Sequence, residues 1–390
     1  MILLINPRTS KTSGENSQFF REPNLGLLYL AAILGLNEIP VDILDLEQFR
    51  DLNQSELRDL VKERVIGYKI FGITSLTNTF HIALDIVRII KNQDKNNFII
   101  LGGPHVSFMY KEILKYDNKT ENLIDIICIG ESENSFLNLV KHLMNTELSK
   151  KNLVEFETRL KSIKGLAFVN SKGRININNP TDDVDLENLP LPARYKLSLE
   201  NYYYDVASVI INRGCPNQCS FCSRQKLFKT TRIRSIESIL TEIRDILSLQ
   251  TYNYINFYDN ININRKFFRD FCNMFVENRI LIPWGCELRV DTISFEEALL
   301  LKKAGCKLVA TGIESANKKV LEINFKYQDP IKVRNGIKNL KKCGISLQAY
   351  FVLGLPGETE DSFYQTVEYI KSLPLNKNDK LNYFIATPYP

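Results

Sequence analysis

The first 148 residues alternate short apolar runs with segments in which apolar residues recur every three or four positions. The former pattern indicates buried strands and the latter indicates helices. Strands are predicted at residues 2–6, 41–46, 70–74, 98–101 and 124–129. Helices are predicted at residues 25–36, 55–65, 82–90, 109–114 and 135–144. Strands that are apolar throughout and separated by helices predict an α/β fold, with a doubly wound parallel sheet of the flavodoxin or Rossmann type.

The alternation of strand and helix patterns is interrupted between residues 149 and 200. Residues 165–170 and 174–177 read as a β-hairpin, and the acidic, proline-containing stretch 179–194 reads as a linker. We therefore expect a front domain at residues 1–148, a hairpin and linker at 149–200, and a second domain at 201–390.

Strand and helix patterns alternate again in the second domain. Strands are predicted at residues 207–212, 254–258, 283–290, 308–313, 347–353 and 381–386. Residues 235–248 and 295–304 have helical apolar spacing, and Ser235 and Ser294 are good helix caps. These repeats predict a partial (β/α)6 barrel, whose chemistry would lie at the carboxyl ends of the strands.

Composition narrows the class of protein without identifying it. The chain has 390 residues, 44% hydrophobic and 24% charged, as expected of globular domains. Its net charge is only +5 and its lysines are scattered, so nucleic acid is not expected as a partner. A signal peptide and an apolar run long enough for a membrane span are both missing from the sequence, which predicts a cytoplasmic protein.

Three of the eight cysteines lie in one short stretch, "RGCPNQCSFCSR", directly after the first strand of the second domain. Cys215, Cys219 and Cys222 can bind three irons of one cubane, whereas complete ligation of a [4Fe–4S] cluster by protein needs four ligands. The remaining iron would be open for a catalytic ligand. Zinc is the main alternative, but the nearby sequence has no further cysteine and no histidine as a fourth ligand.

This cysteine motif, with the aromatic Phe221 before its last cysteine, resembles the signature of the radical S-adenosylmethionine (SAM) superfamily. The resemblance implies that SAM binds the open iron. Its reductive cleavage would give methionine and a 5′-deoxyadenosyl radical that abstracts hydrogen from a small-molecule substrate. An external reductant such as flavodoxin or ferredoxin is expected as a partner.

Four further segments at predicted strand ends resemble SAM-binding segments of the same family: "INFYDN", "WGCELRVD", "TGIES" and "FVLGLPGETE". The residues that the resemblance assigns to SAM binding are Phe221, Asp259, Glu287, Arg289, Glu314, Ser315 and Gly354. A structural ion pair of Glu287 with Arg289, a helix cap at Ser315 and a simple turn at Gly354 are the alternative interpretations.

Small, polar and glycine residues follow four predicted strands of the front domain, where a parallel sheet binds its ligands. Together with "PNLGLLYLAAIL", these loops resemble the cobalamin-binding domain that precedes many radical SAM domains. The cobalamin residues that this implies are Pro7, Thr74, Ser75, Leu76, Thr77, Gly102, Gly103, Pro104, His105, Gly130 and Glu131.

The front domain departs from the cobalamin family in one respect. The Asp-x-His-x-x-Gly motif, which supplies a histidine to cobalt, is absent from residues 7–24. Cobalamin is therefore expected to bind without a protein imidazole, and His105 to be a wall residue. The alternative is a Rossmann-like module that binds no corrinoid.

The resemblance implies a cobalamin-dependent radical SAM enzyme that carries out C-methylation or an oxidative cyclisation. A tRNA methylthiotransferase is disfavoured, because it needs a second cysteine set and the front domain has only Cys128. A non-catalytic iron–sulfur or corrinoid carrier is a further alternative. The final residues, "ATPYP", match a place where relatives continue, so the chain is expected to be a fragment.

Overall fold

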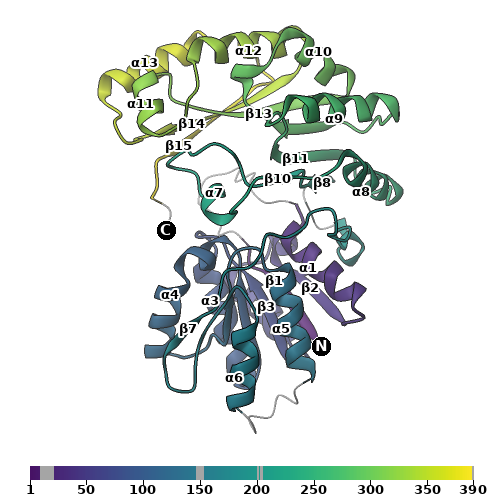
Figure 1. Cartoon of the computed structure of the whole chain (residues 1–390), viewed down its shortest axis with the longest axis vertical. Helices are drawn as coiled ribbons and strands as arrows, with labels where there is room; N and C mark the ends of the chain where they lie inside the picture. Colours follow the sequence, from purple (N-terminus) through teal and green to yellow (C-terminus); the bar gives the residue numbers. More distant parts are fainter. Residues whose placement is uncertain (9–21, 146–152, 200–201, 203–204, 389–390) are drawn as a thin grey trace. The chain divides into compact units, whose positions relative to one another are not determined.

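Two large β-sheets organise the described part of the chain, one within residues 1–204 and the other within residues 205–389, and a third sheet has only two strands. The structure is a computed structural model that describes residues 1–8, 22–145, 153–199, 202 and 205–388 (Figure 1). Among the helices described, none is both long enough and apolar enough to cross a bilayer.

The first unit contains a seven-stranded sheet in the order β2-β1-β3-β4-β5-β6-β7. Its parallel strands are β1 (Ile2–Asn6), β2 (Val41–Asp45), β3 (Ile70–Thr74), β4 (Phe98–Gly102) and β5 (Ile126–Cys128). The order of these five strands is that of flavodoxin-like folds, which confirms the predicted fold class. The hairpin of β6 (Leu166–Val169) and β7 (Ile175–Ile177) extends the same sheet, because β6 pairs antiparallel with β5.

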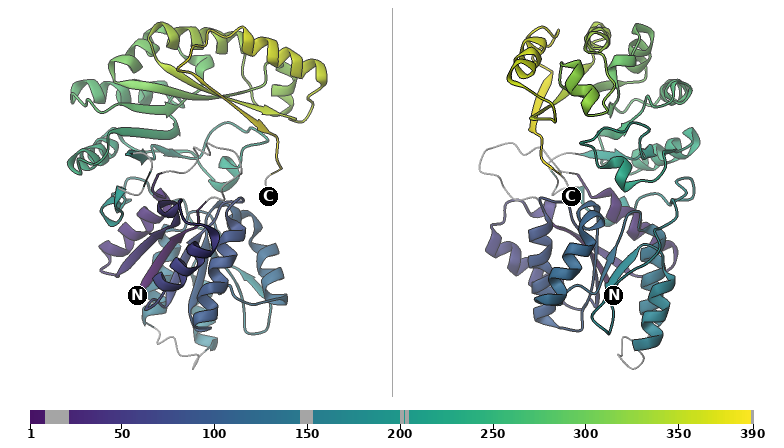
Figure 2. Two further views of the ribbon diagram at one scale, coloured as in Figure 1. Left: turned by 180° about the vertical axis from the view of Figure 1, so that it is seen from behind. Right: turned by 60° about the vertical axis from the view of Figure 1, so that its left-hand side comes forward.

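Helices cover both faces of this sheet (Figure 2). One face packs against α1 (Leu25–Leu36), α5 (Glu133–Asn145) and α6 (Leu153–Ser162). The other packs against α2 (Gln54–Arg64), α3 (Phe80–Gln93) and α4 (Pro104–Lys119), and η1 (Leu46–Phe49) follows β2. Successive side chains of a strand point to opposite faces, so Ile2 and Leu4 belong to the first core and Leu3 and Ile5 to the second.

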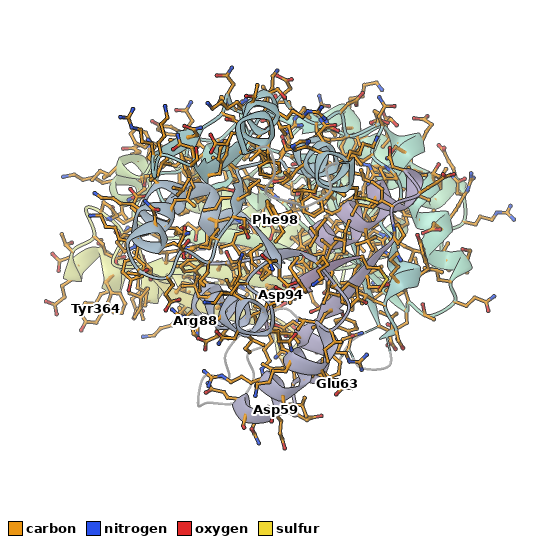
Figure 3. The ribbon with its side chains drawn as sticks, turned by 90° about the horizontal axis from the view of Figure 1, so that it is seen from below. Asp59, Glu63, Arg88, Asp94, Phe98 and Tyr364 are labelled. Atoms are coloured by element: carbon orange, nitrogen blue, oxygen red, sulfur yellow. The ribbon has the colours of Figure 1, made fainter. Side chains whose placement is uncertain are left out.

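The outward sides of α2 and α3 carry charged side chains. Asp59, Glu63 and Arg88 are seen there in Figure 3, and Arg88 pairs with Glu121 at 2.9 Å. Helices with one apolar and one charged face are expected at the surface of a globular unit. Exposed ion pairs of this kind contribute little stability, so the two apolar cores hold the unit together.

The segment predicted to be a linker is hydrogen-bonded to the first unit. The Ala193 N–H donates to the Leu28 carbonyl of α1 at 3.1 Å. The ammonium group of Lys196, which ends η3 (Arg194–Lys196), donates to the carbonyl of Val41 at 2.8 Å, and the Tyr202 hydroxyl donates to the buried carboxylate of Asp45 at 2.6 Å. This stretch therefore lies against α1 and β2.

The second unit contains a six-stranded parallel sheet with its strands in chain order. They are β8 (Val206–Val209), β11 (Tyr254–Asn260), β12 (Trp284–Glu287), β13 (Cys306–Glu314), β14 (Ser346–Leu353) and β15 (Lys380–Ile385). The longer helices lie on one face of this sheet (Figures 1 and 2): α8 (Ile236–Ser248), α9 (Arg265–Glu277), α10 (Phe295–Lys303), α12 (Pro330–Lys342) and α13 (Glu360–Lys371). This arrangement confirms the predicted partial barrel.

Aromatic side chains fill the core between this sheet and its helices. Phe257, Phe271, Phe275 and Trp284 are all 1% exposed or less, and their ring centroids are 5.0 to 6.2 Å apart. Edge-to-face contacts dominate, as expected for aromatic pairs. The core fixes β11 and β12 against α9.

Short elements connect these strands and helices. They are β9 (Asn212–Arg213), α7 (Arg224–Leu227), β10 (Arg232–Ile233), η5 (Val290–Thr292) and α11 (Lys318–Ile323). Two register shifts occur near the carboxyl ends of strands, between Phe257 and Asn260 of β11 and between Gly312 and Glu314 of β13. Such bulges redirect side chains and are frequent beside active sites.

Candidate active site

Cys215, Cys219 and Cys222 lie on one loop between β9 and α7 and are half-buried. Among the described residues no disulfide includes them. Gly214, at the start of the loop, has a φ of 84°, and a Cβ on it would lie 2.3 Å from the Thr230 carbonyl oxygen. Glycine is therefore required for the loop to pass so close to the segment before β10.

The loop offers three thiols to a polynuclear centre. In the described part of the chain, no group of three Cys, His, Asp or Glu side chains is placed to hold a single metal ion. A cubane makes a different demand, because each thiolate binds its own iron and the ligands need not meet at one point. Burial raises the pKa of the Cys219 thiol, and the nearby positive charge of Lys326 opposes that rise.

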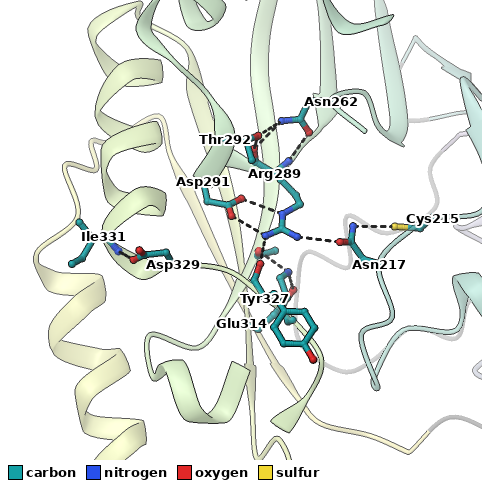
Figure 4. A network of polar contacts seen from close by, with 12 residues as sticks. Cys215, Asn217, Asn262, Arg289, Asp291, Thr292, Glu314, Tyr327, Asp329 and Ile331 are labelled. Atoms are coloured by element: carbon teal, nitrogen blue, oxygen red, sulfur yellow. Dashed lines mark hydrogen bonds and ion pairs between the residues drawn. The ribbon is translucent and has the colours of Figure 1, made fainter. Parts of the chain in front are cut away.

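The side of the loop that carries Cys215 is held by a polar network (Figure 4). The Asn217 amide donates to the Cys215 sulfur at 3.4 Å, and the Arg289 guanidinium donates to the Asn217 side-chain oxygen at 3.1 Å. Arg289 also donates to both carboxylate oxygens of Asp291, at 3.1 and 2.8 Å, and to the Tyr327 carbonyl at 2.5 Å. Arg289 therefore contacts the cysteine loop through Asn217, and its acidic partner is Asp291.

Asp259 joins the two ends of the cysteine loop. Its side chain is 3% exposed, and one carboxylate oxygen accepts from the backbone N–H groups of Ile211 and Asn212 at 2.7 and 3.2 Å. The other oxygen accepts from the guanidinium of Arg224 at 2.5 Å. Ile211 and Asn212 precede the loop, and Arg224, two residues after Cys222, is the first residue of α7. Burial raises the pKa of Asp259, whereas Arg224 and the two N–H groups oppose the rise.

Glu314 forms a buried ion pair at the bulge of β13. The Lys326 ammonium donates to the Glu314 carboxylate at 2.7 Å and to the Gly312 carbonyl at 2.8 Å. A Cβ on Gly312 would lie 2.1 Å from the Glu314 carboxylate, so only glycine leaves room for this pair. Glu314 has a φ of 64°, an uncommon conformation for a residue with a side chain.

Glu287, at the carboxyl end of β12, lies near the charged groups described above. Burial raises the pKa of its carboxyl group to about 7. The positive charges of Arg224 and Lys326 oppose this rise, and the negative charges of Asp259 and Glu314 add to it. A carboxyl group in this position can change its protonation state near neutral pH when a charged ligand binds.

The other residues assigned to SAM differ in accessibility. Ser315 is 0% exposed, and its hydroxyl lies 3.2 Å from that of Thr366 and accepts from the Asn317 N–H at 3.2 Å. Gly354 is exposed, with a φ of 80° and open space where a side chain would lie, and its N–H donates to Glu358. Phe221 is half-buried. Gly354 and Phe221 can contact a ligand, whereas Ser315 is occupied within the protein.

In the first unit, the loops after β3 and β4 lie against each other. The Ser75 N–H donates to the Gly102 carbonyl at 3.0 Å, and the His105 N–H donates to the Ser75 carbonyl at 3.3 Å. Gly103 has a φ of 97°, and a Cβ on it would lie 2.7 Å from the Ser75 carbonyl oxygen and 2.8 Å from the Thr74 hydroxyl. The contact between the loops therefore depends on glycine.

These two loops present polar groups that fit a polar ligand. The Ser75 hydroxyl is buried and has no hydrogen-bond partner among the described residues. The Nδ1 atom of His105 lies 3.2 Å from the Thr77 hydroxyl. The centroids of the His105 and Phe80 rings are 4.4 Å apart. Burial lowers the pKa of His105, which favours the neutral ring. A buried hydroxyl is expected to have a partner, so the Ser75 side chain is a natural donor to a bound molecule.

Ser107 of α4 connects the loop after β5 with the loop after β4. The Gly130 N–H donates to the Ser107 hydroxyl at 2.9 Å, and that hydroxyl donates to the Gly103 carbonyl at 2.8 Å. Glu131 is buried and lines a surface cavity of about 640 Å³ formed by α5, α6 and the stretch near Thr181. This cavity contains no other residue of the predicted cobalamin set.

The remaining cobalamin residues occupy loop and helix starts. Pro7 is buried directly after β1, and Pro104 is the first residue of α4. The Leu76 N–H donates to the Thr79 hydroxyl at 3.0 Å, which shapes the loop before α3.

Sequence comparison identifies both units. The family model of the radical SAM superfamily matches residues 209–370, and that of the B12 binding domain matches residues 19–140. An uncharacterized methyltransferase of Pyrococcus horikoshii, PH0819, is 31% identical over 378 residues, which cover 94% of this chain and 76% of that protein. The chain thus belongs to the radical SAM superfamily, in the group whose members carry a B12-binding domain.

Two further similarities bear on fold and on chain length. The anaerobic magnesium-protoporphyrin IX monomethyl ester cyclase of Cereibacter sphaeroides is 26% identical over 84% of this chain, which spans 53% of the cyclase. The radical SAM methyltransferase TsrM from Kitasatospora setae, solved with cobalamin and a [4Fe–4S] cluster, superposes with a TM-score of 0.75 at 18% identity. That match covers 98% of this chain and 71% of TsrM, and it shows the shared fold.

Four residues of the candidate site were not found from the sequence: Asn217, Arg224, Asn324 and Lys326. Asn217 and Arg224 lie within or directly beside the cysteine motif, so proximity could have suggested them. Asn324 belongs to the site because its side-chain oxygen accepts from the Ser220 hydroxyl of the cysteine loop at 2.8 Å. Asn324 and Lys326 lie more than 100 residues after the cysteines, so only the fold reveals them.

Proposed function

We propose that residues 205–389 bind a [4Fe–4S] cluster through Cys215, Cys219 and Cys222 and bind SAM at its open iron. The observation that carries this proposal is one loop with three half-buried thiols, braced at both ends by the buried carboxylate of Asp259. When bound, the reduced cluster supplies the electron that cleaves SAM and gives the 5′-deoxyadenosyl radical.

The charged residues around the loop have complementary roles in this proposal. SAM carries an amino group and a carboxylate at one end, so its binding requires both signs of charge. Glu287 and Glu314 offer carboxylates to the amino group and the ribose hydroxyls, and Lys326 offers a cation to the carboxylate. Glu314 is buried and Glu287 and Lys326 are half-buried, which strengthens their attraction for a charged ligand.

We further propose that the loops after β3, β4 and β5 bind cobalamin. The buried Ser75 hydroxyl supports this assignment, because it has no hydrogen-bond partner in the described part of the chain. Gly102 leaves open space beside the backbone of the β4 loop, Gly103 lets that loop pack against Ser75, and His105 forms a neutral wall beside it. Cobalamin bound here would deliver a methyl group or take part in a cyclisation, reactions named for the methyltransferase and cyclase relatives.

The proposed reaction is C-methylation or oxidative cyclisation of a small molecule, with flavodoxin or ferredoxin as the electron donor. The chain spans about half the length of the cyclase to which it is similar.

Anaerobic reconstitution with iron, sulfide, SAM and a chemical reductant tests the function. The protein should bind about four irons per chain and form 5′-deoxyadenosine. Cys219→Ala should abolish the product. The matched control is Cys343→Ala, because Cys343 is also half-buried but caps α12 outside the loop, and it should retain the product. Equal activity in the two variants would refute the proposal.

A further inference from the structure

Asn324 is an entirely buried polar residue just after α11. Its side-chain amide donates to the Val320 carbonyl at 2.8 Å and to the Pro356 carbonyl at 2.9 Å. Its side-chain oxygen accepts from the Ser220 hydroxyl at 2.8 Å, and its backbone carbonyl accepts from the Ser220 N–H at 3.0 Å. Both amide protons and both oxygens of this residue are therefore in use.

These bonds join two loops that are far apart in the sequence. Ser220 lies between Cys219 and the aromatic Phe221 in the cysteine loop. Pro356 lies in the loop after β14, between Gly354 and Gly357. One buried side chain thus contacts both the loop proposed to hold the cluster and the loop after β14. The Gly/Pro motif of this second loop, "FVLGLPGETE", resembles the family segment that approaches the adenine of SAM, so we call it the adenine loop.

Gly357 shows that the second loop lies close against α11. It has a φ of 84°, and a Cβ on it would lie 2.5 Å from the Ile323 side chain, which directly precedes Asn324. The loop is thus held by backbone packing as well as by the bond to Pro356. The distance between the two loops is fixed through α11.

Resting on the function proposed above, we infer that Asn324 is a positioning residue that sets the separation between the cluster loop and the adenine loop. SAM bound to the cluster must reach from an iron to the adenine site, so one molecule bridges both loops. Two exposed loops that could move independently would have to be ordered when SAM binds, which weakens binding. Asn324 orders them beforehand.

A helix cap alone does not account for this set of bonds. Asn278 occupies the equivalent place after α9, and its amide donates to the Met274 carbonyl, four residues earlier, at 2.9 Å. Asn324 makes the same bond to Val320 and in addition contacts Ser220 and Pro356. Asn278→Ala is therefore a matched control, because it removes a cap without touching either loop.

The test measures 5′-deoxyadenosine formation against SAM concentration in the reconstituted chain and three variants: Asn324→Ala, Ser220→Ala and Asn278→Ala. Loss of the bonds to the two loops should raise the SAM KM of Asn324→Ala roughly tenfold, with iron content and kcat within about twofold of the unsubstituted protein. Ser220→Ala loses one of these bonds and should raise KM roughly threefold. Asn278→Ala should leave KM unchanged.

The possible failures are distinguishable. If the unsubstituted chain forms no 5′-deoxyadenosine, the proposed function and this inference fail together. If it forms the product but Asn324→Ala has the KM of Asn278→Ala, only the inference fails. If Asn324→Ala does not fold, Ser220→Ala decides, because it leaves the helix cap intact and an unchanged SAM KM would overturn the inference.

Discussion

Asp259→Asn removes the negative charge that joins the two ends of the cysteine loop. The carboxamide oxygen can still accept from the Ile211 and Asn212 N–H groups, but its NH2 group would face the Arg224 guanidinium, donor against donor. The Arg224 side chain is 28% exposed, so water replaces part of the lost bond. We therefore expect the free energy of unfolding to fall by about 2 kcal/mol. This is less than the fall of roughly 3–5 kcal/mol that follows when a fully buried ion pair is broken.

The fluorescence of Trp284 reports the stability of the structural unit that contains Asp259. Trp284 is the single tryptophan of the chain and is fully buried in the core of residues 205–389. The unfolding temperature measured by Trp284 fluorescence should fall by about 4–8 °C for a structural unit of this size. If the Asp259 carboxylate holds the two ends of the cysteine loop together, an iron chelator should also remove iron roughly 5- to 30-fold faster from the reconstituted variant than from the unsubstituted protein.

Asp379 provides a matched control. Its side chain is 2% exposed and accepts from the N–H groups of Leu347 and Asn376, both at 2.7 Å, and from the Lys341 ammonium at 2.5 Å. Asp379→Asn should lower the transition temperature by a similar amount but leave the rate of iron loss unchanged. If the two variants lost iron at the same rate, the loop-bracing argument for Asp259 would be refuted.

Two further predictions concern protonation and cobalamin. The pKa of Glu287 is about 7 in the folded protein against 4.5 for the free side chain, so the folded state keeps a proton that the unfolded chain loses as pH rises. Stability should therefore fall between about pH 4.5 and about pH 7, by about 3 kcal/mol, and Glu287→Gln should remove this part of the fall. Parallel pH profiles of the Trp284 transition in the two cofactor-free proteins would contradict this. Ser75→Ala should leave stability within about 0.5 kcal/mol but weaken cobalamin binding roughly five- to tenfold, measured by absorbance titration. Ser107→Ala, which loses its bonds to Gly103 and Gly130, should instead lower stability by about 1–2 kcal/mol, and the reverse pattern would exclude the Ser75 contact.

Local patterns in the sequence predict the elements and their order well. The strand expected at residues 2–6 is β1 (Ile2–Asn6), and the helix expected at residues 25–36 is α1 (Leu25–Leu36). Apolar periodicity suffices here because each element buries a face that its own residues define. The helix expected at residues 109–114 is longer, α4 (Pro104–Lys119), because the buried Val106 continues the apolar spacing of Met109 and Ile113 by one turn and polar residues extend the other end.

These local patterns do not predict the tertiary contacts. Composition marked residues 179–194 as a linker, yet Ala193 is bonded to α1. Motif resemblance selected Asp259 as a SAM residue, but only the fold shows that Arg224 and the strand before the cysteines already use both of its oxygens. The Lys326–Glu314 pair likewise depends on the bulge of β13, which no local pattern encodes.

Electron paramagnetic resonance of the anaerobically reduced protein can show whether the three thiolates leave one iron of a cubane open to SAM. We predict a [4Fe–4S] signal that changes when SAM is added and that is lost in Cys219→Ala but not in Cys343→Ala. A signal that does not respond to SAM, or a protein that binds only zinc, would contradict the account.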